Sequence, residues 1–199
     1  MENNLVWIDL EMTGLDPENH VIIELASIVT DAQLRIIAEG PTIAIYHPQK
    51  VLSGIDEWSK THHQASGLLN RVEESTIDTK AAEQETIKFL SSHCNPGQCP
   101  LCGNSIWQDR RFLAKHMPEL ERFFHYRIID VSSVKELARR WYPDLPPYPK
   151  KKAHLALEDI KESIAELLYF RRIIFLSPEP LEAPEVKKAR MEANEHETS

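Results

Sequence analysis

Hydrophobic positions along residues 1–45 fall into three short runs. Leu5–Leu10 is apolar apart from one acid, and turn-forming residues follow it, which predicts a buried strand that runs into a turn. Residues 21–30 and 34–45 are rich in β-branched side chains, and only a short polar connection separates them. We therefore expect three consecutive strands that pair as a meander.

Beyond Pro48 the pattern alternates between helical and strand periodicity. It predicts a helical and looped segment over 55–71, a helix over 76–91, a strand over 99–104, a helix over 106–116, a strand over 126–131 and a helix over 132–141. The apolar side of the 76–91 helix is expected to include Ala81 and Leu90. Prolines exclude regular structure from 142–152, and a long amphipathic helix is expected from Ala156 to about Phe175. This order of elements indicates an α/β fold with a mixed sheet.

A chain of 199 residues suits one domain of ordinary size. We expect that domain over residues 1–176 and a disordered acidic tail over 177–199, where bulky apolar side chains almost disappear. No apolar run is long enough for a membrane span, and the N-terminus has no signal-peptide pattern. The three cysteines lie between Cys94 and Cys102, an odd and clustered set that argues against a disulfide framework. A reducing, cytoplasmic location is the expectation.

The formal net charge of −8 limits the choice of partner. A protein that follows long nucleic acid usually presents a basic surface, because each phosphate that it neutralises releases counterions. This chain lacks such an excess, so either nucleic acid is not its partner or its substrate is short. Clustered acids are also what a magnesium or manganese site requires.

The first candidate for chemistry is the pair Asp9 and Glu11 at the end of the first predicted strand. Residues two apart on a strand point to the same face, so the two carboxylates project together. An acid inside an apolar strand is costly unless it is paired or bound to metal. The alternative is an ordinary solvent-exposed strand end, and the spacing alone does not exclude it.

Two further groups add to this pair. Asp109 lies in the first turn of the helix over 106–116, where it could also be a structural cap. His154 and Asp159 flank the start of the last helix, five residues apart. Five helical residues turn through about 140°, so the two side chains converge only if His154 precedes the helix. A lone histidine is otherwise most often a surface residue.

Taken together, these motifs resemble the DEDDh family of 3′-to-5′ exonucleases and, within it, the oligoribonucleases. The resemblance covers about residues 5–175, and its strongest stretches are Trp7–Asp16, Gly103–Leu113, Tyr126–Arg127, Asp130–Ser132 and His154–Asp159. It implies a ribonuclease H-like fold, with a five-stranded mixed sheet flanked by helices, so that residues 1–176 would be an exonuclease domain. It also implies a hydrolase that shortens oligoribonucleotides, especially dinucleotides, to 5′-mononucleotides.

The resemblance also implies roles for individual residues. Two Mg²⁺ or Mn²⁺ ions, about 4 Å apart, would be held by four acids, with His154 as the general base for a metal-bound water. The four acids are Asp9, Glu11, Asp109 and Asp159. Substrate-binding positions carried over from the family are Leu15, Trp58, His63, Ser105, Tyr126, Arg127 and Ser132.

Within that substrate-binding set, the 5′ phosphate would be gripped by Ser105, Arg127 and Ser132. Leu15 would wedge between bases, Trp58 and Tyr126 would stack on them, and His63 would contact the 3′ side. Tyr126 would come from a neighbouring subunit, which makes a homodimer the expected active unit. Ordinary core packing is the alternative for the three hydrophobic side chains.

Several features leave alternatives open. Trp107 is bulky where many relatives carry a smaller residue. His93, Cys94, Cys99 and Cys102 resemble a zinc cluster, but their spacing is irregular and free cysteine also packs as a small hydrophobe. The rival functions are an exonuclease for longer DNA or structured RNA and a partner-binding module without activity. The acidic charge argues against the first, and the full set of acids with His154 argues against the second.

Overall fold

A computed structural model describes residues 3–149 and 155–175 of the chain. Its centre is a five-stranded mixed sheet in the order β3-β2-β1-β4-β5. The strands are β1 Leu5–Met12, β2 Ile22–Thr30, β3 Ile36–Ala44, β4 Pro100–Gly103 and β5 His125–Asp130. The first three pair antiparallel, whereas β4 pairs parallel with β1 and β5 parallel with β4. The expected meander and mixed sheet are confirmed.

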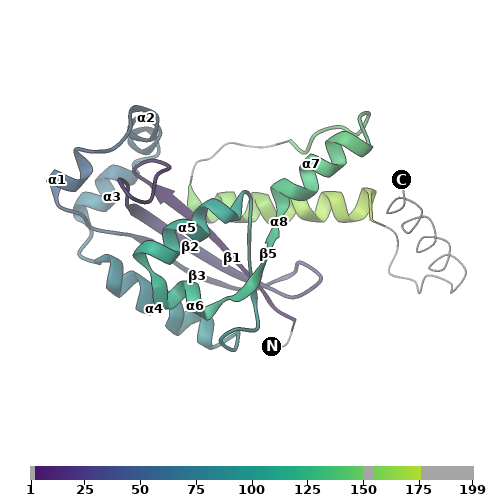
Figure 1. Cartoon of the computed structure of the whole chain (residues 1–199), viewed down its shortest axis with the longest axis horizontal. Coiled ribbons are helices and arrows are strands. Elements are labelled where there is room, and N and C mark those ends of the chain that lie inside the picture. The colour runs from purple at the N-terminus through teal and green to yellow at the C-terminus, as the bar shows by residue number, and fades with distance from the viewer. Residues whose placement is uncertain (1–2, 150–154, 176–199) are drawn as a thin grey trace, which may run out of the picture.

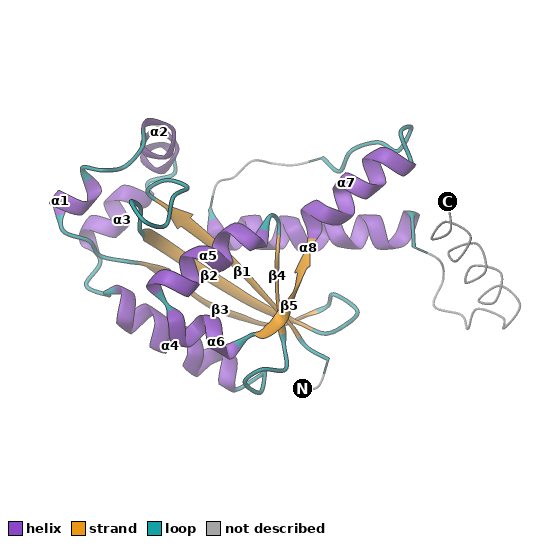
Figure 2. Cartoon of the chain, in the orientation of Figure 1, coloured by secondary structure: helices purple, strands orange, loops and turns teal. Residues whose placement is uncertain are grey.

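Helices cover both faces of this sheet. Their bounds are α1 Gln49–Leu52, α2 Glu57–Ala65, α3 Leu68–Glu74, α4 Thr79–Ser91, α5 Ile106–His116, α6 Pro118–Phe123, α7 Val131–Trp141 and α8 Ala156–Ile173. Helices α4, α5 and α6 lie on one face, and α8 crosses the other face (Figures 1 and 2). Because both faces are covered, every residue of β2 is buried.

Strand β1 shows how the sequence divides its side chains between the two faces. Val6, Ile8 and Leu10 belong to the core cluster that contains Phe112 and Leu113 of α5. Trp7 instead packs in the cluster that contains Ala156 and Ile160 of α8. Side chains alternate along a strand, so Asp9 and Glu11 continue on the face of Trp7, beneath α8. The acids at the end of β1 therefore point towards the helix that carries Asp159.

Some details differ from the expectations. We predicted that the helix over 106–116 would end before Pro118, which is correct, but a further short helix, α6, begins at that proline. Proline suits the first position of a helix, where its missing N–H would be unpaired in any case. In α4, Ala81 is exposed and Glu83 is buried, so the predicted placement of Ala81 was wrong.

The last expectations concern the ends of the chain. Residues 177–199 lie outside the described residues, so the domain over 1–176 and the tail stay predictions. None of the helices in the described part of the chain has both the length and the hydropathy that a bilayer crossing requires.

Candidate active site

Three carboxylates converge where β1 ends and α8 begins. One oxygen atom from each of Asp9, Glu11 and Asp159 lies within 4.8 Å of the others, and all three residues are partly buried. Asp9 and Glu11 share a face of β1, and Asp159 lies in the first turn of α8, which packs on that face. The structure thus brings together acids from the two ends of the described chain.

Asp109 joins this group from α5. It is buried, and its Oδ1 accepts a hydrogen bond from the backbone N–H of Leu10 at 3.0 Å. Its charge raises the pKa of Asp9, which places the two carboxylates within electrostatic range. Asp109 therefore bonds to the strand that carries Asp9 and Glu11.

The protonation equilibria of these acids are strongly perturbed. Burial, with added repulsion from Asp109, Glu11 and Asp159, holds the pKa of Asp9 well above its usual value. Burial and the charge of Asp159 raise the pKa of Glu11 to about 8, and burial raises that of Asp109 to about 7. A set of buried carboxylates that repel one another in this way suits a divalent cation with oxygen ligands, such as Mg²⁺ or Mn²⁺.

The sequence matches the RNase_T family, described as Exonuclease, over residues 6–167. Oligoribonucleases of Alcanivorax borkumensis and Marinobacter nauticus are 61% and 62% identical to the chain over 170 and 174 residues. The alignments cover 85% and 87% of this chain and 94% and 97% of those proteins. The chain belongs to the oligoribonuclease family. Its sequence-based assignment to the exonucleases is confirmed.

Solved structures show the fold of this family at greater distance. Exonuclease I of Methylocaldum szegediense matches with a TM-score of 0.59 and 17% identity over 86% of this chain. Escherichia coli exonuclease I, in complex with a 5cy-dT13 oligonucleotide, matches with a TM-score of 0.61 and 16% identity over 87% of the chain. The chain spans 41% and 42% of those longer proteins, and the likeness confirms the ribonuclease H-like fold.

His154, the expected general base of this oligoribonuclease-family chain, lies outside the described residues. Leu155, the next residue, is the N-cap of α8 and has extended backbone angles. Glu158 of the first turn is exposed, contacts Lys161 at 3.3 Å and is not one of the three clustered carboxylates. The role of His154 stays a prediction.

His63 of α2 is buried against the end of β1. Its Nε2 lies 2.9 Å from the carbonyl oxygen of Met12, and its Nδ1 lies 3.8 Å from Oε2 of Glu11. Burial lowers the pKa of the imidazole. The structure thus brings His63 beside one of the three clustered carboxylates, and its contact with the 3′ side of a substrate stays a prediction.

The three hydrophobic side chains assigned to the substrate are all surface residues. Leu15, Trp58 and Tyr126 are 70%, 62% and 72% exposed, which excludes the alternative of core packing in the isolated chain. Trp58 stacks on the ring of His62 at 3.8 Å, and the Arg127 guanidinium lies 5.3 Å from the Tyr126 ring. Exposed aromatic faces are what stacking on a base requires.

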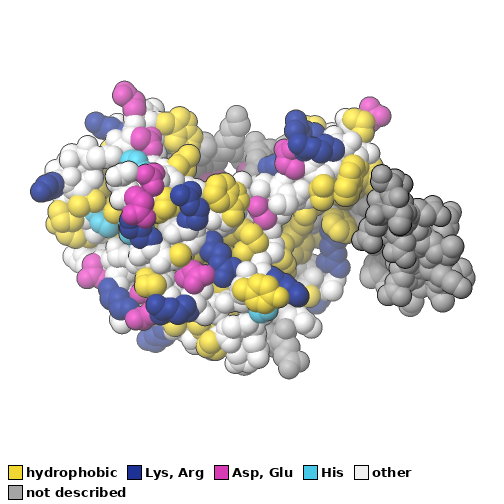
Figure 3. All heavy atoms as spheres, in the orientation of Figure 1, with side chains coloured by type: hydrophobic (Ala, Val, Ile, Leu, Met, Phe, Trp, Pro, Cys, Tyr) yellow, Lys and Arg dark blue, Asp and Glu magenta, His cyan; other side chains and the backbone are white. Residues whose placement is uncertain are grey.

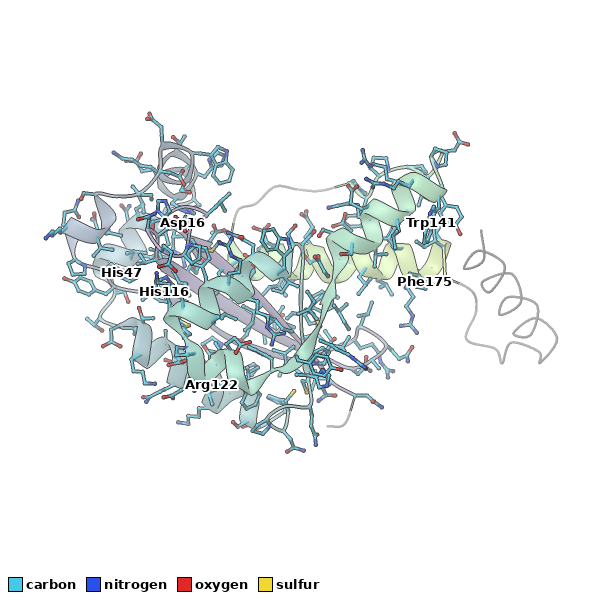
Figure 4. All side chains as sticks on the ribbon, viewed as in Figure 1. Asp16, His47, His116, Arg122, Trp141 and Phe175 are labelled. Atoms are coloured by element: carbon cyan, nitrogen blue, oxygen red, sulfur yellow. The ribbon has the colours of Figure 1, made fainter. Side chains whose placement is uncertain are left out.

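Helix α5 holds the loop that carries Leu15. Gln108 Nε2 donates to the carbonyl oxygen of Leu15 at 2.5 Å, and His116 Nε2 lies 3.1 Å from that of Pro17. Figure 4 labels His116 on this helix and Asp16 on the loop. Leu15 is therefore presented by an anchored loop. Trp107, one residue before Gln108, is exposed beneath the Arg111 guanidinium, so it does not fill the core.

Two of the expected phosphate-binding residues meet at Asp130. Its Oδ1 accepts hydrogen bonds from the Ser105 N–H at 2.8 Å, the Ser132 N–H at 2.9 Å and the Ser132 hydroxyl at 2.7 Å. Ser105 has a left-handed backbone with φ of 57°, which its bond to Asp130 helps to hold. The third residue, Arg127, is exposed on β5.

The sequence analysis missed two carboxylates. Asp130, which accepts hydrogen bonds from Ser105 and Ser132, lies in a stretch that carries the family resemblance, but no role was predicted for it. Glu24 is buried on β2 directly opposite Glu11. The signal for Glu24 was present, since it is an acid inside an apolar strand like Asp9.

The cysteines that resemble part of a zinc cluster lie in the protein interior. Cys94, Cys99 and Cys102 are free and buried, and Cys102 donates to the Pro100 carbonyl oxygen at 3.5 Å. Within the described ranges, the group with metal-binding geometry consists of Asp9, Glu11 and Asp159.

Proposed function

We propose that this chain hydrolyses oligoribonucleotides of two to a few residues from the 3′ end and releases 5′-mononucleotides. Two divalent cations, Mg²⁺ or Mn²⁺, would be held by Asp9, Glu11, Asp109 and Asp159, with His154 as general base. The observation that carries this proposal is the cluster of carboxylate oxygens within 4.8 Å, with Asp109 bonded to the same strand.

Cation binding would depend on rigidly held carboxylates, and removal of the proton from water on a basic side chain. Bound cations lower the pKa of water and offset the charge that develops on the phosphate. Asp9 and Glu11 are fixed by strand β1, and Asp159 by the first turn of α8, so the ligands are organised before substrate arrives. His154 precedes α8 by two residues and would remove the proton from the attacking water.

The length of the substrate would be limited by contacts with both its 3′ and its 5′ end. His63, beside Glu11, would contact the 3′ side, and Ser105, Arg127 and Ser132 would grip the 5′ phosphate. Leu15, Trp58 and Tyr126 would hold the bases between these ends, each stack being worth roughly 1–3 kcal/mol. On the face drawn in Figure 3, lysine and arginine side chains are scattered among acids and form no continuous stripe, which favours short substrates.

The active unit would be a homodimer in which Tyr126 reaches the site of the other protomer. Exposed hydrophobic side chains on β5 and α7 support this proposal, namely Tyr126, Ile128, Leu137 and Trp141. Figure 3 shows hydrophobic side chains gathered over α7, and Figure 4 shows Trp141 at the end of that helix. The free, buried cysteines also suit a reducing compartment such as the cytoplasm.

A comparison of substrate lengths tests the function. With Mn²⁺, we expect faster turnover of a 5′-phosphorylated diribonucleotide than of a ten-residue RNA or DNA, with 5′-mononucleotides as products and none formed in a chelator. Preference for the ten-residue substrate would point to an exonuclease for longer nucleic acid. Absence of all hydrolysis would point to a binding module. Either result would overturn the proposal.

A further inference from the structure

Glu24 is a buried glutamate beside the carboxylate cluster. It is 1% exposed on β2 and lies directly opposite Glu11 in the antiparallel register of β1 and β2. Directly opposed residues place their side chains on the same face of a sheet. Glu24 therefore projects to the face that carries Asp9 and Glu11 and that α8 covers.

Both carboxylate oxygens of Glu24 have partners in other elements. Oε1 contacts Nη1 of Arg71, from α3, at 2.5 Å. Oε2 accepts the backbone N–H of Ala156, the first residue of α8, at 3.4 Å. The N-cap of α8, Leu155, makes no side-chain capping bond. Glu24 thus supplies from β2 the side-chain acceptor that the N-cap Leu155 lacks.

We propose that Glu24, held by Arg71, is a positioning residue that fixes the first turn of α8 and so places Asp159 against Asp9 and Glu11. This inference rests on the proposed function. An acceptor at a helix N-terminus satisfies a free N–H and interacts favourably with the helix dipole. Asp159 lies only three residues beyond Ala156, so the bond that anchors Ala156 also limits the movement of Asp159.

The contacts of Glu24 distinguish it from a metal ligand. Its two oxygens are directed to the guanidinium and to a backbone N–H, so a cation would have to displace one of them. Arg71 also adds a positive charge next to several acids, and its charge lowers the pKa of Glu11. Groups that orient metal ligands commonly affect metal affinity or activity by about 10- to 100-fold when they are removed.

The chain contains a matched control in Glu83. This glutamate of α4 is also 1% exposed, and its Oε1 accepts the N–H groups of Glu119 and Leu120 at the start of α6. Its Oε2 pairs with Lys80 at 3.0 Å. Glu83 therefore does for α6 what Glu24 does for α8, but α6 carries none of the four acids.

The test compares Glu24→Gln and Glu83→Gln in the full chain. For Glu24→Gln we expect the Kd for Mn²⁺, measured by calorimetry without substrate, to rise about 10-fold. Hydrogen exchange should accelerate in the first turn of α8, and kcat on a dinucleotide should fall about 10-fold with KM within about twofold. Glu83→Gln should lower Tm similarly but leave Mn²⁺ affinity and kcat near those of the wild type.

Equal effects of the two substitutions on Mn²⁺ affinity would overturn the positioning role in favour of general destabilisation. Arg71→Gln provides a second test, because the positioning role predicts weaker Mn²⁺ binding. If Glu24 and Arg71 affected the cation only through their charges, Arg71→Gln would tighten Mn²⁺ binding, because it removes a positive charge. A wild-type protein without dinucleotide turnover would reject the proposed function, whereas Mn²⁺ binding and hydrogen exchange would still decide the role of Glu24.

Discussion

The imidazole of His63 turns Nδ1 towards Glu11, 3.8 Å from its Oε2, and within the described part of the chain this buried nitrogen has no hydrogen-bond partner. Its other nitrogen faces the Met12 carbonyl oxygen at 2.9 Å, and a carbonyl only accepts, so Nε2 carries the hydrogen of the neutral ring. When Glu11 is ionised, as a cation ligand would be, Nδ1 and the Glu11 carboxylate are two acceptors that face each other. A hydroxyl donor from the 3′ end of a substrate would satisfy this arrangement.

Substitution of His63 by glutamine should therefore weaken recognition of a 3′ hydroxyl. The amide can still donate to Met12, but it lacks the acceptor at Nδ1. We expect kcat/KM for a dinucleotide with a 3′ hydroxyl to fall about 10-fold, as for loss of one hydrogen bond. A 3′-deoxy substrate should be affected much less, so the two substrates become nearly equal in the variant.

His47 provides the control for this prediction. Its Nε2 also lies near a carbonyl oxygen, that of Ile22 at 2.8 Å. His47→Gln should keep the wild-type preference for the 3′ hydroxyl. If His63→Gln also kept it, His63 would have no part in 3′-end recognition.

The metal-free protein should lose stability as the pH rises. The pKa of Glu11 is raised from 4.5 to about 8 and that of Asp109 from 3.8 to about 7. At pH values between the ordinary and the raised pKa of each carboxyl group, the folded state binds more protons than the unfolded state. The free energy of unfolding therefore falls with increasing pH. Thermal melts in a chelator should show Tm decreasing from about pH 5 to pH 8, and saturating Mn²⁺ should offset that decrease.

The contribution of Glu11 can be isolated with Glu11→Gln. Removing this group should flatten the dependence of Tm on pH in the chelator, and the variant should be more stable than the wild type at pH 8. A wild type and variant with parallel pH profiles would show that the carboxylate is not held protonated in the metal-free state.

Neutralising a carboxylate that we propose as a metal ligand should separate activity from stability. For Asp9→Asn we expect kcat to fall by on the order of 10³ or more, because the cations lose a ligand. Tm in a chelator should not fall, since the substitution removes repulsion from Asp109, Glu11 and Asp159. Hydrolysis at near the wild-type rate would refute the assigned role of Asp9.

His154→Ala should lower kcat by about 10²- to 10⁴-fold, the usual contribution of a general base. Mn²⁺ binding by this variant should stay within about twofold of the wild type, because His154 is not assigned as a ligand. The pair of measurements thus tests the role of the base apart from that of the acids. Loss of Mn²⁺ binding would instead assign His154 to the metal site.

Mixing two inactive variants tests whether Tyr126 acts across a dimer. In a mixed dimer of Asp9→Asn and Tyr126→Ala, one site keeps both its own Asp9 and its partner's tyrosine. Half of randomly assembled dimers are mixed and each has one complete site, so activity should recover to about a quarter of the wild-type level. Activity no greater than that of the separate variants would place Tyr126 in its own protomer's site or outside any site.

The sequence was most informative where a local pattern has one structural solution. The apolar run interrupted by Asp9 specified β1, and the helix predicted over 106–116 has the same bounds in the structure. It was less informative where burial depends on neighbours. Ala81 was expected in the core, but Glu83 takes a buried position because α6 offers it two N–H donors. Helical periodicity alone cannot anticipate such a partner.

The amino-acid sequence by itself determined that Asp9 and Glu11 share one face, because strand side chains alternate with a period of two. Only the tertiary structure decided which distant groups meet them. Asp159 reaches the pair because α8 packs across β1 and β2, and Glu24 holds the start of that helix. Periodicity is a property of neighbouring residues, whereas convergence depends on how buried surfaces of separate elements fit together.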